Sequence, residues 1–493
     1  MIESPIAIID IGSNSIRMVV YDGLSRSPSI LFNERVLAEL GKTLSTTGTL
    51  NPETLELAYY NLQRFKAVIH NMKAQYFVVA TAALREASDG PAFTQKLRDE
   101  LGLDVQIISG DEEARLGVMG LLAAWVDVNG VVGDLGGGSL ELSYVENSQY
   151  IQGSSLPLGG LRLISQFQQK RKKLQDEIDQ NIQQLSGLKD VACNKAFYPI
   201  GGAWRAIARY YMEKTGYPIH LIHGLKVKSK DLMPYLQELA KMSRAELDSL
   251  EMITKRRRKV MGTAATVMIK ILEYTQALYV VFSGCGVREG LLYTKITEAE
   301  QHEDPLLARC RQMEAQLSRF NNGQAIYTWS QMVTEGEKPE YNHLYHAICM
   351  LNDVSWFEHR DYRAELIYRR VLTQRFGGGV NHKERALMAI ALFVSYGGDL
   401  DDALIRNVRT LLSYKQLKIA ERFGITIRLA RRLGGGPVEP LNHAKLEVKG
   451  QSFKLKIDES LESFMGEHIE KLMKKLADNM NLQYKKPKIY KTV

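Results

Sequence analysis

Two stretches of the chain share one pattern, in which a β-branched run ends on an aspartate and continues into a turn of small residues. The first is IAIIDIGSNSIRMVVYD, residues 6–22, and the second is VVGDLGGGSLELSYVE, residues 131–146. Asp10 and Asp134 occupy equivalent places, 124 residues apart. A strand–Asp–x–Gly–x–x–Ser pattern used twice indicates two related domains that grip one ligand between them.

The residues around each turn predict alternating strands and helices. In the first segment we expect strands at 6–10, 17–21, 76–81 and 105–109, with helices from Pro52, near 91–101 and from Gly110. The second segment repeats this plan from near Val131. It adds glycine turns before helices in FYPIGGAWRAIARYY and YVVFSGCGVREGLLY. The alternation is typical of α/β domains.

The C-terminal part of the chain has a different character. Residues 300–433 predict helices, and the run Gly434–Pro437 is a strong break. Beyond it, AKLEVKGQSFKLKID predicts a hairpin that turns at Lys449–Gly450, followed by an amphipathic helix over 460–480. We predict four domains, at 1–125 and 126–298 (α/β), 299–436 (all-α) and 437–493 (small α+β).

The doubled turn predicts a phosphate site. Glycine and serine let backbone N–H groups approach a ligand closely and converge on it, which suits phosphate oxygens. An aspartate beside each turn fits this use when a divalent cation lies between the carboxylate and the phosphate. The candidate phosphate-binding residues are Gly12, Ser13, Asn14, Ser15, Gly136, Gly137, Gly138 and Ser139.

Composition restricts the class of protein. The hydrophobic and charged fractions, 45% and 24%, are those of a globular chain, and no apolar run approaches the ~20 residues of a membrane-spanning helix. No basic leader is evident at the N-terminus. The cysteines Cys193, Cys285, Cys310 and Cys349 form no CxxC pair, which favours reduced thiols and gives a zinc site no support. We therefore predict a cytoplasmic protein without a membrane partner.

The chain is basic, with a net charge of +8 and a pI of about 9.0. Basic runs occur at 170–173, at 255–259 and in the last ten residues. This balance favours an anionic partner, but it does not choose between nucleic acid, nucleotide and polyphosphate.

The motifs DIGSNSIRMVV, VATAALREA, IISGDEEARLGVMG, GDLGGGSLEL and FSGCGVREGLLY resemble the exopolyphosphatase/guanosine pentaphosphate phosphohydrolase (Ppx/GppA) family. They are spread over residues 6–295. That family belongs to the superfamily of actin, hexokinase and heat-shock ATPases. The resemblance implies two duplicated ribonuclease-H-like domains that hydrolyse a terminal phosphoanhydride in the cleft between them, with Mg²⁺ as cofactor. Mn²⁺ is an alternative, and a monovalent cation such as K⁺ is a further candidate.

The resemblance also implies roles for single residues. Glu113 matches the general base for the attacking water, and Glu112 is the alternative if the match is one position out. Arg85 matches an arginine that reaches toward the phosphate chain. Asp134, Glu141 and Asp10 match the acidic residues around the metal. Without the resemblance, Asp111–Glu113 would suit a helix N-terminus equally well, because the helix dipole favours carboxylates there.

The all-α module resembles the HD-type metal hydrolases only in part. Asn352-Asp353 stands where that fold has a His-Asp pair, and Arg363 stands at a later ligand position. Neighbouring histidines, among them His343 and His346, do not complete a set. The resemblance thus implies an inert module that lengthens a substrate channel, and a homodimer.

Four functions are consistent with these features. The charge favours an exopolyphosphatase that releases orthophosphate from inorganic polyphosphate. The closest alternative is a guanosine pentaphosphate 5′-phosphohydrolase, which could also take guanosine tetraphosphate as a ligand. A kinase of the same superfamily is a third. It would need a catalytic aspartate for the acceptor hydroxyl, and SGDEEAR has a glutamate at the matching position, which disfavours a kinase. A non-catalytic protein that binds an alarmone or RNA is the fourth. The basic runs lack the interleaved aromatics of an RNA-binding module, so no specific nucleic acid is expected.

Overall fold

The computed structural model describes residues 4–167, 170–185, 195–376 and 378–490. The chain divides into two compact units. The first comprises residues 1–305 with 377–379, and the second comprises 306–376 with 380–493. Cys193 lies outside the described residues, and Cys285, Cys310 and Cys349 are buried and form no disulfide within the described part of the chain. No helix in the described part of the chain combines the length and apolar character needed to cross a bilayer.

The first unit opens with a five-stranded sheet in the order β3-β2-β1-β4-β5. Its strands are β1 (Ile6–Ile11), β2 (Ile16–Tyr21), β3 (Ile30–Val36), β4 (Gln75–Ala80) and β5 (Val105–Ile107). The first three strands are antiparallel neighbours, whereas β1, β4 and β5 run parallel. The helices are α1 (Leu44–Thr47), α2 (Pro52–Asn71), α3 (Ala82–Glu86), α4 (Gly90–Leu101) and α5 (Gly110–Ala124).

A second sheet in this unit repeats the plan, with the order β8-β7-β6-β9-β11-β10. Its strands are β6 (Gly130–Leu135), β7 (Leu140–Glu146), β8 (Gln149–Leu156), β9 (Ala196–Ile200), β10 (Lys226–Lys228) and β11 (Tyr279–Val281). Strands β6, β7, β8, β9 and β11 have the directions and neighbours of β1 to β5. The two sheets therefore confirm the predicted duplication, and β10 is an addition at one edge.

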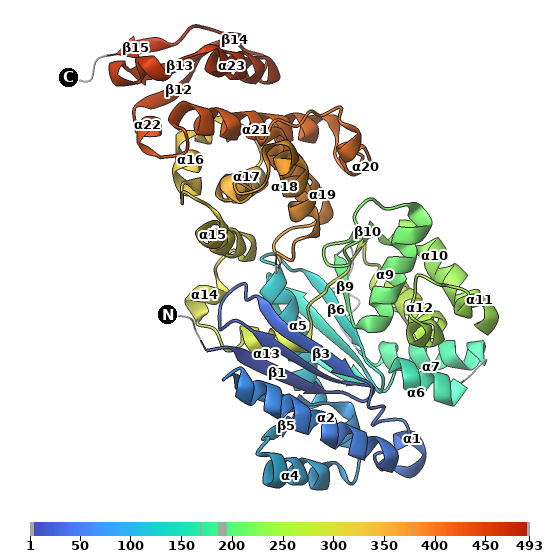
Figure 1. Ribbon diagram of the computed structural model, residues 1–493. Coiled ribbons are helices and arrows are strands. Elements are labelled where there is room, and N and C mark those ends of the chain that lie inside the picture. The colour runs from blue at the N-terminus through green and yellow to red at the C-terminus, as the bar shows by residue number, and fades with distance from the viewer. Residues whose placement is uncertain (1–3, 168–169, 186–194, 377, 491–493) are drawn as a thin grey trace. The chain divides into compact units, whose positions relative to one another are not determined.

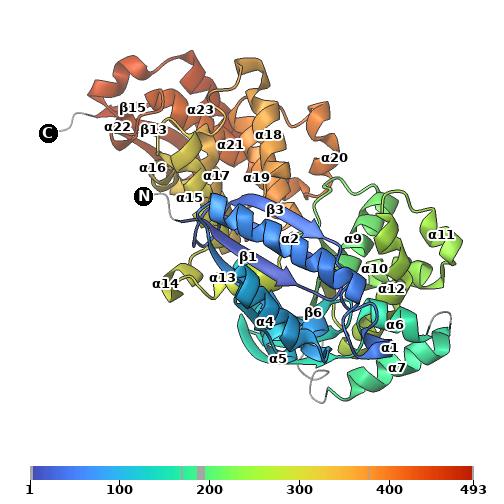
Figure 2. The same cartoon turned by 60° about the horizontal axis from the view of Figure 1, so that its bottom comes forward.

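Helices cover both faces of each sheet (Figures 1 and 2). The helices of the second half are α6 (Gly160–Phe167), α7 (Arg171–Gln183), α9 (Gly202–Thr215), α10 (Ser229–Lys241), α11 (Arg244–Asp248), α12 (Lys255–Thr275), α13 (Val287–Tyr293) and α14 (Glu298–Gln301). Helices α2 and α4 cover one face of the first sheet, and α6, α7, α9, α10 and α12 pack with the second. Helix α5 packs against both sheets, through Leu116 on one side and Val118 on the other. Side chains near the start of α5 are thereby held at the junction of the two domains.

Helix α13 packs on α5 through a pair of glycines. A Cβ at Gly290 would lie 1.9 Å from the backbone oxygen of Leu116, and one at Gly120 would lie 2.1 Å from the backbone oxygen of Gly286. We expect Gly290→Ala to destabilise the protein by about 1–3 kcal/mol, because relief of the clash must move the two helices apart. Urea unfolding of the purified variant measures this.

Gly117→Ala is the matched control for this prediction, because it lies on α5, the helix against which Gly290 packs, and its Cβ would meet nothing within 4 Å. It is expected to raise the free energy of unfolding by a few tenths to about 1 kcal/mol, since alanine restricts the unfolded chain. Equal effects of the two substitutions would contradict the packing argument.

The second unit consists of a helical part followed by a small sheet. The helices are α15 (Pro305–Leu317), α16 (Gly323–Trp329), η1 (Gln331–Thr334), α17 (Pro339–Met350), η2 (Leu351–Asp353), η3 (Arg360–Tyr362), α18 (Arg363–Thr373), α19 (His382–Ser395), η4 (Ala403–Ile405), α20 (Arg406–Arg409), α21 (Tyr414–Gly434), α22 (Glu439–Asn442), η5 (Glu459–Phe464) and α23 (Glu467–Asn479). Buried apolar residues dominate α19, which packs against α18 and α21.

The predicted hairpin is present as β12 (Ala444–Lys449) and β13 (Ser452–Asp458), and Gly450 at its turn has a φ of +57°. The closing helix was predicted from residue 460, which is wrong: the segment before Gly466 is a 3₁₀ turn, and the helix begins at Glu467. The sequence also missed β14 (Gln483–Tyr484) and β15 (Lys488–Tyr490), which pair in parallel with β13. They are two and three residues long, too short to show a strand pattern of their own.

Candidate active site

The two aspartate–glycine turns have the same backbone geometry. In the first, the N–H of Gly12 donates to the backbone oxygen of Ser15 at 3.1 Å. In the second, the N–H of Gly136 donates to that of Ser139 at 3.0 Å. Strand register places Arg17 opposite Asp10 but Glu141 opposite Asp134. The two turns therefore share their backbone geometry, but the residue opposite the aspartate is basic in the first domain and acidic in the second.

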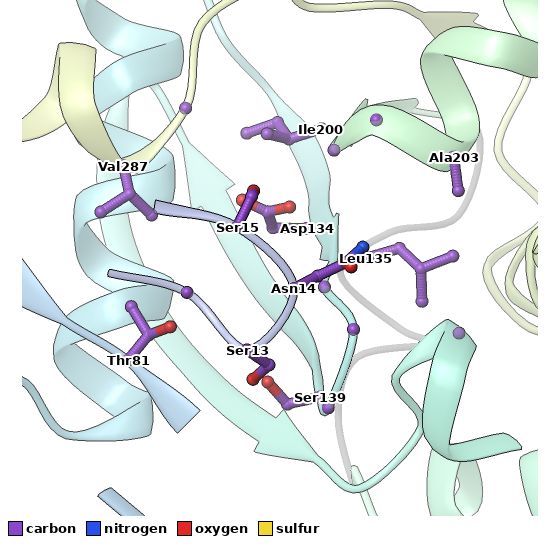
Figure 3. Close-up of a pocket in the computed structure, with 18 of the residues that line it drawn as sticks. Ser13, Asn14, Ser15, Thr81, Asp134, Leu135, Ser139, Ile200, Ala203 and Val287 are labelled. Carbon is purple, nitrogen blue, oxygen red and sulfur yellow. The ribbon is translucent and has the colours of Figure 1, made fainter. Parts of the chain in front are cut away.

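The two loops lie against each other across the cleft (Figure 3). A Cβ at Gly138 would lie 3.4 Å from Ser13 Oγ, and one at Gly137 would lie 3.6 Å from Asn14 Cβ. All eight predicted loop residues line a cavity of about 190 Å³. The prediction that the repeats face one cleft is thus confirmed by the positions of the loops.

Glu113 lines the same cavity from the first turn of α5. Ser109 caps this helix, and its hydroxyl accepts from the N–H of Glu112 at 3.1 Å. The Glu113 carboxylate accepts from Arg85 Nη1 at 3.1 Å, and its side chain is 13% exposed. Burial raises the pKa of Glu113 well above its ordinary value, and the nearby charge of Glu141 adds to this against the opposing effect of Arg85.

The neighbouring glutamate is in a different position. Glu112 does not line the cavity, and its carboxylate accepts from Arg115 Nε and Nη2 at 2.7 and 2.8 Å. Its hydrogen bonds to Arg115 lower its pKa. Of the two candidate bases, the structure places only Glu113 in the cleft. Arg85 borders an adjoining depression rather than the cavity itself and contacts the cleft through Glu113.

Two further carboxylates are buried in the cleft. Asp134 ends β6, and burial raises its pKa to about 6. Glu141 on β7 is 2% exposed and accepts from Ser155 Oγ at 2.8 Å. Burial and the charge of Asp134 raise the pKa of Glu141 to about 7. The charges of Arg205 and Arg288 offset part of the rise at Asp134, and that of Arg85 part of the rise at Glu141, but burial outweighs them.

The predicted metal residues meet in one place but do not form a closed cage. Asp10 accepts from Arg288 Nη1 at 2.8 Å, while Asp134 and Glu141 have no arginine hydrogen bond among the described residues. No three His, Cys, Asp or Glu side chains in the described part of the chain are grouped closely enough to hold a metal by themselves. The set fits Mg²⁺, which is commonly bound by one or two carboxylates with water and substrate phosphate completing its shell.

Five arginines that the sequence analysis missed also line the cavity. They are Arg17, Arg35, Arg205, Arg257 and Arg288. Arg205 donates to the backbone oxygen of Gly284 at 3.1 Å, and Arg35 donates to Ser15 Oγ at 3.0 Å. The guanidinium of Arg257 occupies the space where a Cβ at Gly202 would stand, so a larger residue there would displace this guanidinium.

These arginines repel one another. Burial, with the charges of neighbouring arginines, lowers the pKa of Arg17 and of Arg35 to about 10 and that of Arg257 to about 9. Burial and Arg288 also lower the pKa of Arg205. A bound polyanion would offset both effects, so the cluster is arranged to receive several phosphate charges.

The sequence contains a pattern from which some of these arginines could have been predicted. Arg17, Arg205 and Arg288 each follow a glycine turn within five residues, at the start of the next strand or helix. Arg257 lies in the basic run 255–259, which was noted only for its charge. Arg35 lies on β3 and has no such signal.

Two related α/β domains have paired glycine–serine loops, carboxylates and an arginine cluster in one cleft, an arrangement that suits an anionic ligand. The comparisons give its family. Residues 19–299 match the Ppx/GppA phosphatase family, and residues 304–486 match the exopolyphosphatase C-terminal family. The chain belongs to the Ppx/GppA phosphatase family, as the sequence motifs predicted.

The names of similar proteins point to different activities and roles. Retrograde regulation protein 2 of Saccharomyces cerevisiae is 25% identical over 438 residues, which are 80% of this chain and 73% of the yeast protein. Guanosine-5′-triphosphate,3′-diphosphate pyrophosphatase of Aliivibrio fischeri is 27% identical over 313 residues, 60% of each chain. The crystal structure of an exopolyphosphatase from Cytophaga hutchinsonii matches 59% of this chain and 97% of its own, at 22% identity and a TM-score of 0.55. That likeness confirms the fold of the first unit.

Proposed function

We propose that this protein is an exopolyphosphatase that hydrolyses the terminal phosphoanhydride of inorganic polyphosphate. The observation that carries the proposal is the cleft itself, where Glu113 faces two amide loops and five arginines. A phosphoanhydride chain end carries dense negative charge. Its hydrolysis depends on positioning and on charge neutralisation more than on covalent chemistry.

Each part of the cleft has a place in this reaction. The N–H groups of residues 13–15 and 137–139 hold the oxygens of the terminal phosphate, while those of Gly12 and Gly136 close the turns. The arginines neutralise the following phosphates. Glu113 takes a proton from water as the water attacks in line, and its raised pKa makes it a stronger base once ionised. Arg85, hydrogen-bonded to Glu113, keeps that carboxylate aimed at the water.

Magnesium is the cofactor that this donor set suits. Asp134 and Glu141, with Asp10 near them, would hold it, and it would neutralise charge on the phosphate oxygens. Its charge would also favour the ionised form of the buried carboxylates, whose pKa values are raised by burial.

Guanosine pentaphosphate 5′-phosphohydrolysis is the second candidate, and the similarity to the Aliivibrio pyrophosphatase favours it. Both reactions remove a terminal phosphate and require the same base. The five arginines in the cleft favour the inorganic chain, because they could neutralise several successive phosphates of a long polyanion. A binding protein without turnover is the third candidate, suggested by the regulatory name of the yeast relative.

One experiment separates the three. Orthophosphate release is measured with Mg²⁺, using long-chain polyphosphate and guanosine pentaphosphate at matched concentrations of chain ends. Faster release from polyphosphate is expected, and faster release from the nucleotide would favour the second candidate. Tight binding of either compound without release, when an active family member serves as positive control, would identify a binding protein.

The helical module and the oligomeric state complete the proposal. Asn352 and Asp353 are buried, and the Asp353 carboxylate is bound by Arg319, so we propose that the module holds no metal centre of the HD type. We also propose a homodimer, which sedimentation of the purified protein would test.

A further inference from the structure

The second unit contains a pocket of its own, which the hydrolytic reaction does not use. Its volume is about 480 Å³, within the range of about 300–1,000 Å³ typical of small-molecule sites. The pocket is formed by the segment after α15, by η2, by the start of α18 and by the ends of α19 and α21. Its lining residues are Arg319, Phe320, Asn322, Asn352, Asp353, Trp356, Arg360, Arg363, Ser395, Tyr396, Arg428, Arg431, Arg432, Gly435 and Gly436.

The charge of this lining is strongly positive. Six of these residues are arginines, and Asp353 is the one carboxylate among them. Asp353 is already neutralised, since Arg319 donates to it from Nη2 at 2.6 Å and from Nε at 3.1 Å. The remaining arginines therefore face the pocket without a lining carboxylate of their own.

Some of the arginines are fixed in place by the fold. Arg319 is held by Asp353 through both guanidinium contacts and through its backbone N–H at 3.0 Å. Arg431 donates to the backbone oxygens of Asn352 and Ser395, and it lies 4.2 Å from the centroid of the Tyr396 ring. These groups are positioned before any ligand arrives, which lowers the entropic cost of binding.

Other arginines in the pocket are available to a ligand. The side chains of Arg360, Arg428 and Arg432 make no hydrogen bond and no ion pair with any described residue. Arg428 and Arg432 lie one turn apart on α21, where like charges repel. Burial and the charge of Arg432 lower the pKa of Arg428. An anion bound between them would relieve both effects.

The pocket also has a planar, aromatic side. The Arg319 guanidinium lies 5.4 Å from the ring centroid of Trp356 and 5.3 Å from that of Phe320. Trp356 is 37% exposed, although its Nε1 donates to the backbone oxygen of Leu317 at 3.0 Å. Nucleic-acid bases stack on such aromatic rings and guanidinium planes.

We propose that this pocket is a second ligand site, which binds a nucleotide carrying at least two linked phosphates. The phosphates contact Arg360, Arg428 and Arg432, and the base lies against the Arg319–Trp356 pair. A metal centre does not suit the pocket, because its one carboxylate is bound by arginine. Free inorganic phosphate chains share the phosphate chemistry but would leave the aromatic side unused.

Isothermal titration of the full-length protein tests the proposal. The probes are ADP and GDP, with pyrophosphate as the same two phosphates without a base. The main variant is Arg360→Ser/Arg432→Ser, in which both changed residues are exposed and folding is not at risk. We expect ADP or GDP to lose about tenfold or more in affinity at one site, because charge-assisted hydrogen bonds to phosphate are lost.

The matched control is Lys383→Ser/Arg406→Ser, which removes two exposed charges from the same unit outside the pocket. It is expected to bind both nucleotides as the wild type does. The catalytic cleft is unchanged in both variants. Nucleotide that binds to the cleft therefore contributes equally to the titration of each variant. Unaltered nucleotide binding by the Arg360/Arg432 variant would overturn the proposal, as would equal losses in the control.

A further variant tests the base. Trp356→Leu is expected to remove the preference for a nucleotide over pyrophosphate while pyrophosphate binding is retained. If pyrophosphate binds the wild-type pocket as tightly as both nucleotides, the site recognises phosphate chains alone, and the assignment of a nucleotide is wrong. Failure of the protein to release orthophosphate from polyphosphate would leave these results intact, because the two sites are tested separately.

Discussion

Replacing Glu113 with glutamine is expected to lower kcat for orthophosphate release by about 10²–10⁴-fold, the usual contribution of a general base. Glutamine keeps the size of the side chain but cannot accept the proton of the attacking water. The loops and arginines that hold the substrate are untouched, so KM is expected to change by only a few-fold. Steady-state kinetics on polyphosphate measure both constants.

The chain supplies a matched control at the adjacent position. Glu112→Gln removes a carboxylate from the same turn of α5, but this group is paired with Arg115 and lies outside the cleft. Its kcat is expected to stay within a few-fold of the wild type. A Glu113→Gln enzyme that keeps more than about a tenth of wild-type kcat would exclude Glu113 as the base, and a large loss in Glu112→Gln alone would move the role there.

Replacing Glu141 with glutamine is expected to stabilise the metal-free protein by roughly 1–3 kcal/mol at pH 8. The pKa of Glu141 is raised to about 7 in the folded protein from an ordinary 4.5, and each unit corresponds to about 1.4 kcal/mol. Ser155 Oγ can donate to the glutamine oxygen as it does to the carboxylate, and the glutamine amide can donate to the Ser139 hydroxyl, so no hydrogen bond need be lost. Urea unfolding in the presence of a chelator measures the difference.

The sign of this effect sets its pH dependence. Between about pH 4.5 and pH 7 the folded protein holds a proton on Glu141 that the unfolded chain releases, so this group makes stability fall as the pH rises through that window. Below it the group is protonated in both states. The stabilisation by Glu141→Gln should therefore be small at pH 4, grow to pH 7 and level off above.

Glu146→Gln is the control, because this glutamate lies on the same strand at the protein surface. Its substitution is expected to change the free energy of unfolding by less than about 0.5 kcal/mol. A Glu141→Gln protein that is less stable than the wild type at pH 8 would show that the carboxylate is not costly to the fold. The same variant is expected to lose activity with Mg²⁺, which would identify a buried carboxylate retained for function at the expense of stability.

The cleft is one part of the molecule that sequence reasoning located well. The turns after Asp10 and Asp134 require small residues at fixed spacing. Because this requirement involves only neighbouring residues, it can be recognised from the sequence alone. The position of Glu113 followed from its motif and from the helix that Gly110 begins. The start of the last helix was misplaced because 3₁₀ turns and helices share short-range apolar spacing.

What the sequence by itself determined is the duplicated α/β plan, the family and the loops that line the cleft, because each depends on motifs of residues close together in the chain. What only the tertiary structure decided is the electrostatic character of the two pockets. Arg35 on β3 and Arg257 on α12 meet in one cleft, and Arg360 and Arg432 meet in another. The raised pKa values of Asp134 and Glu141 arise from burial by several elements. Charge and desolvation act through space, so no spacing along the chain reveals them.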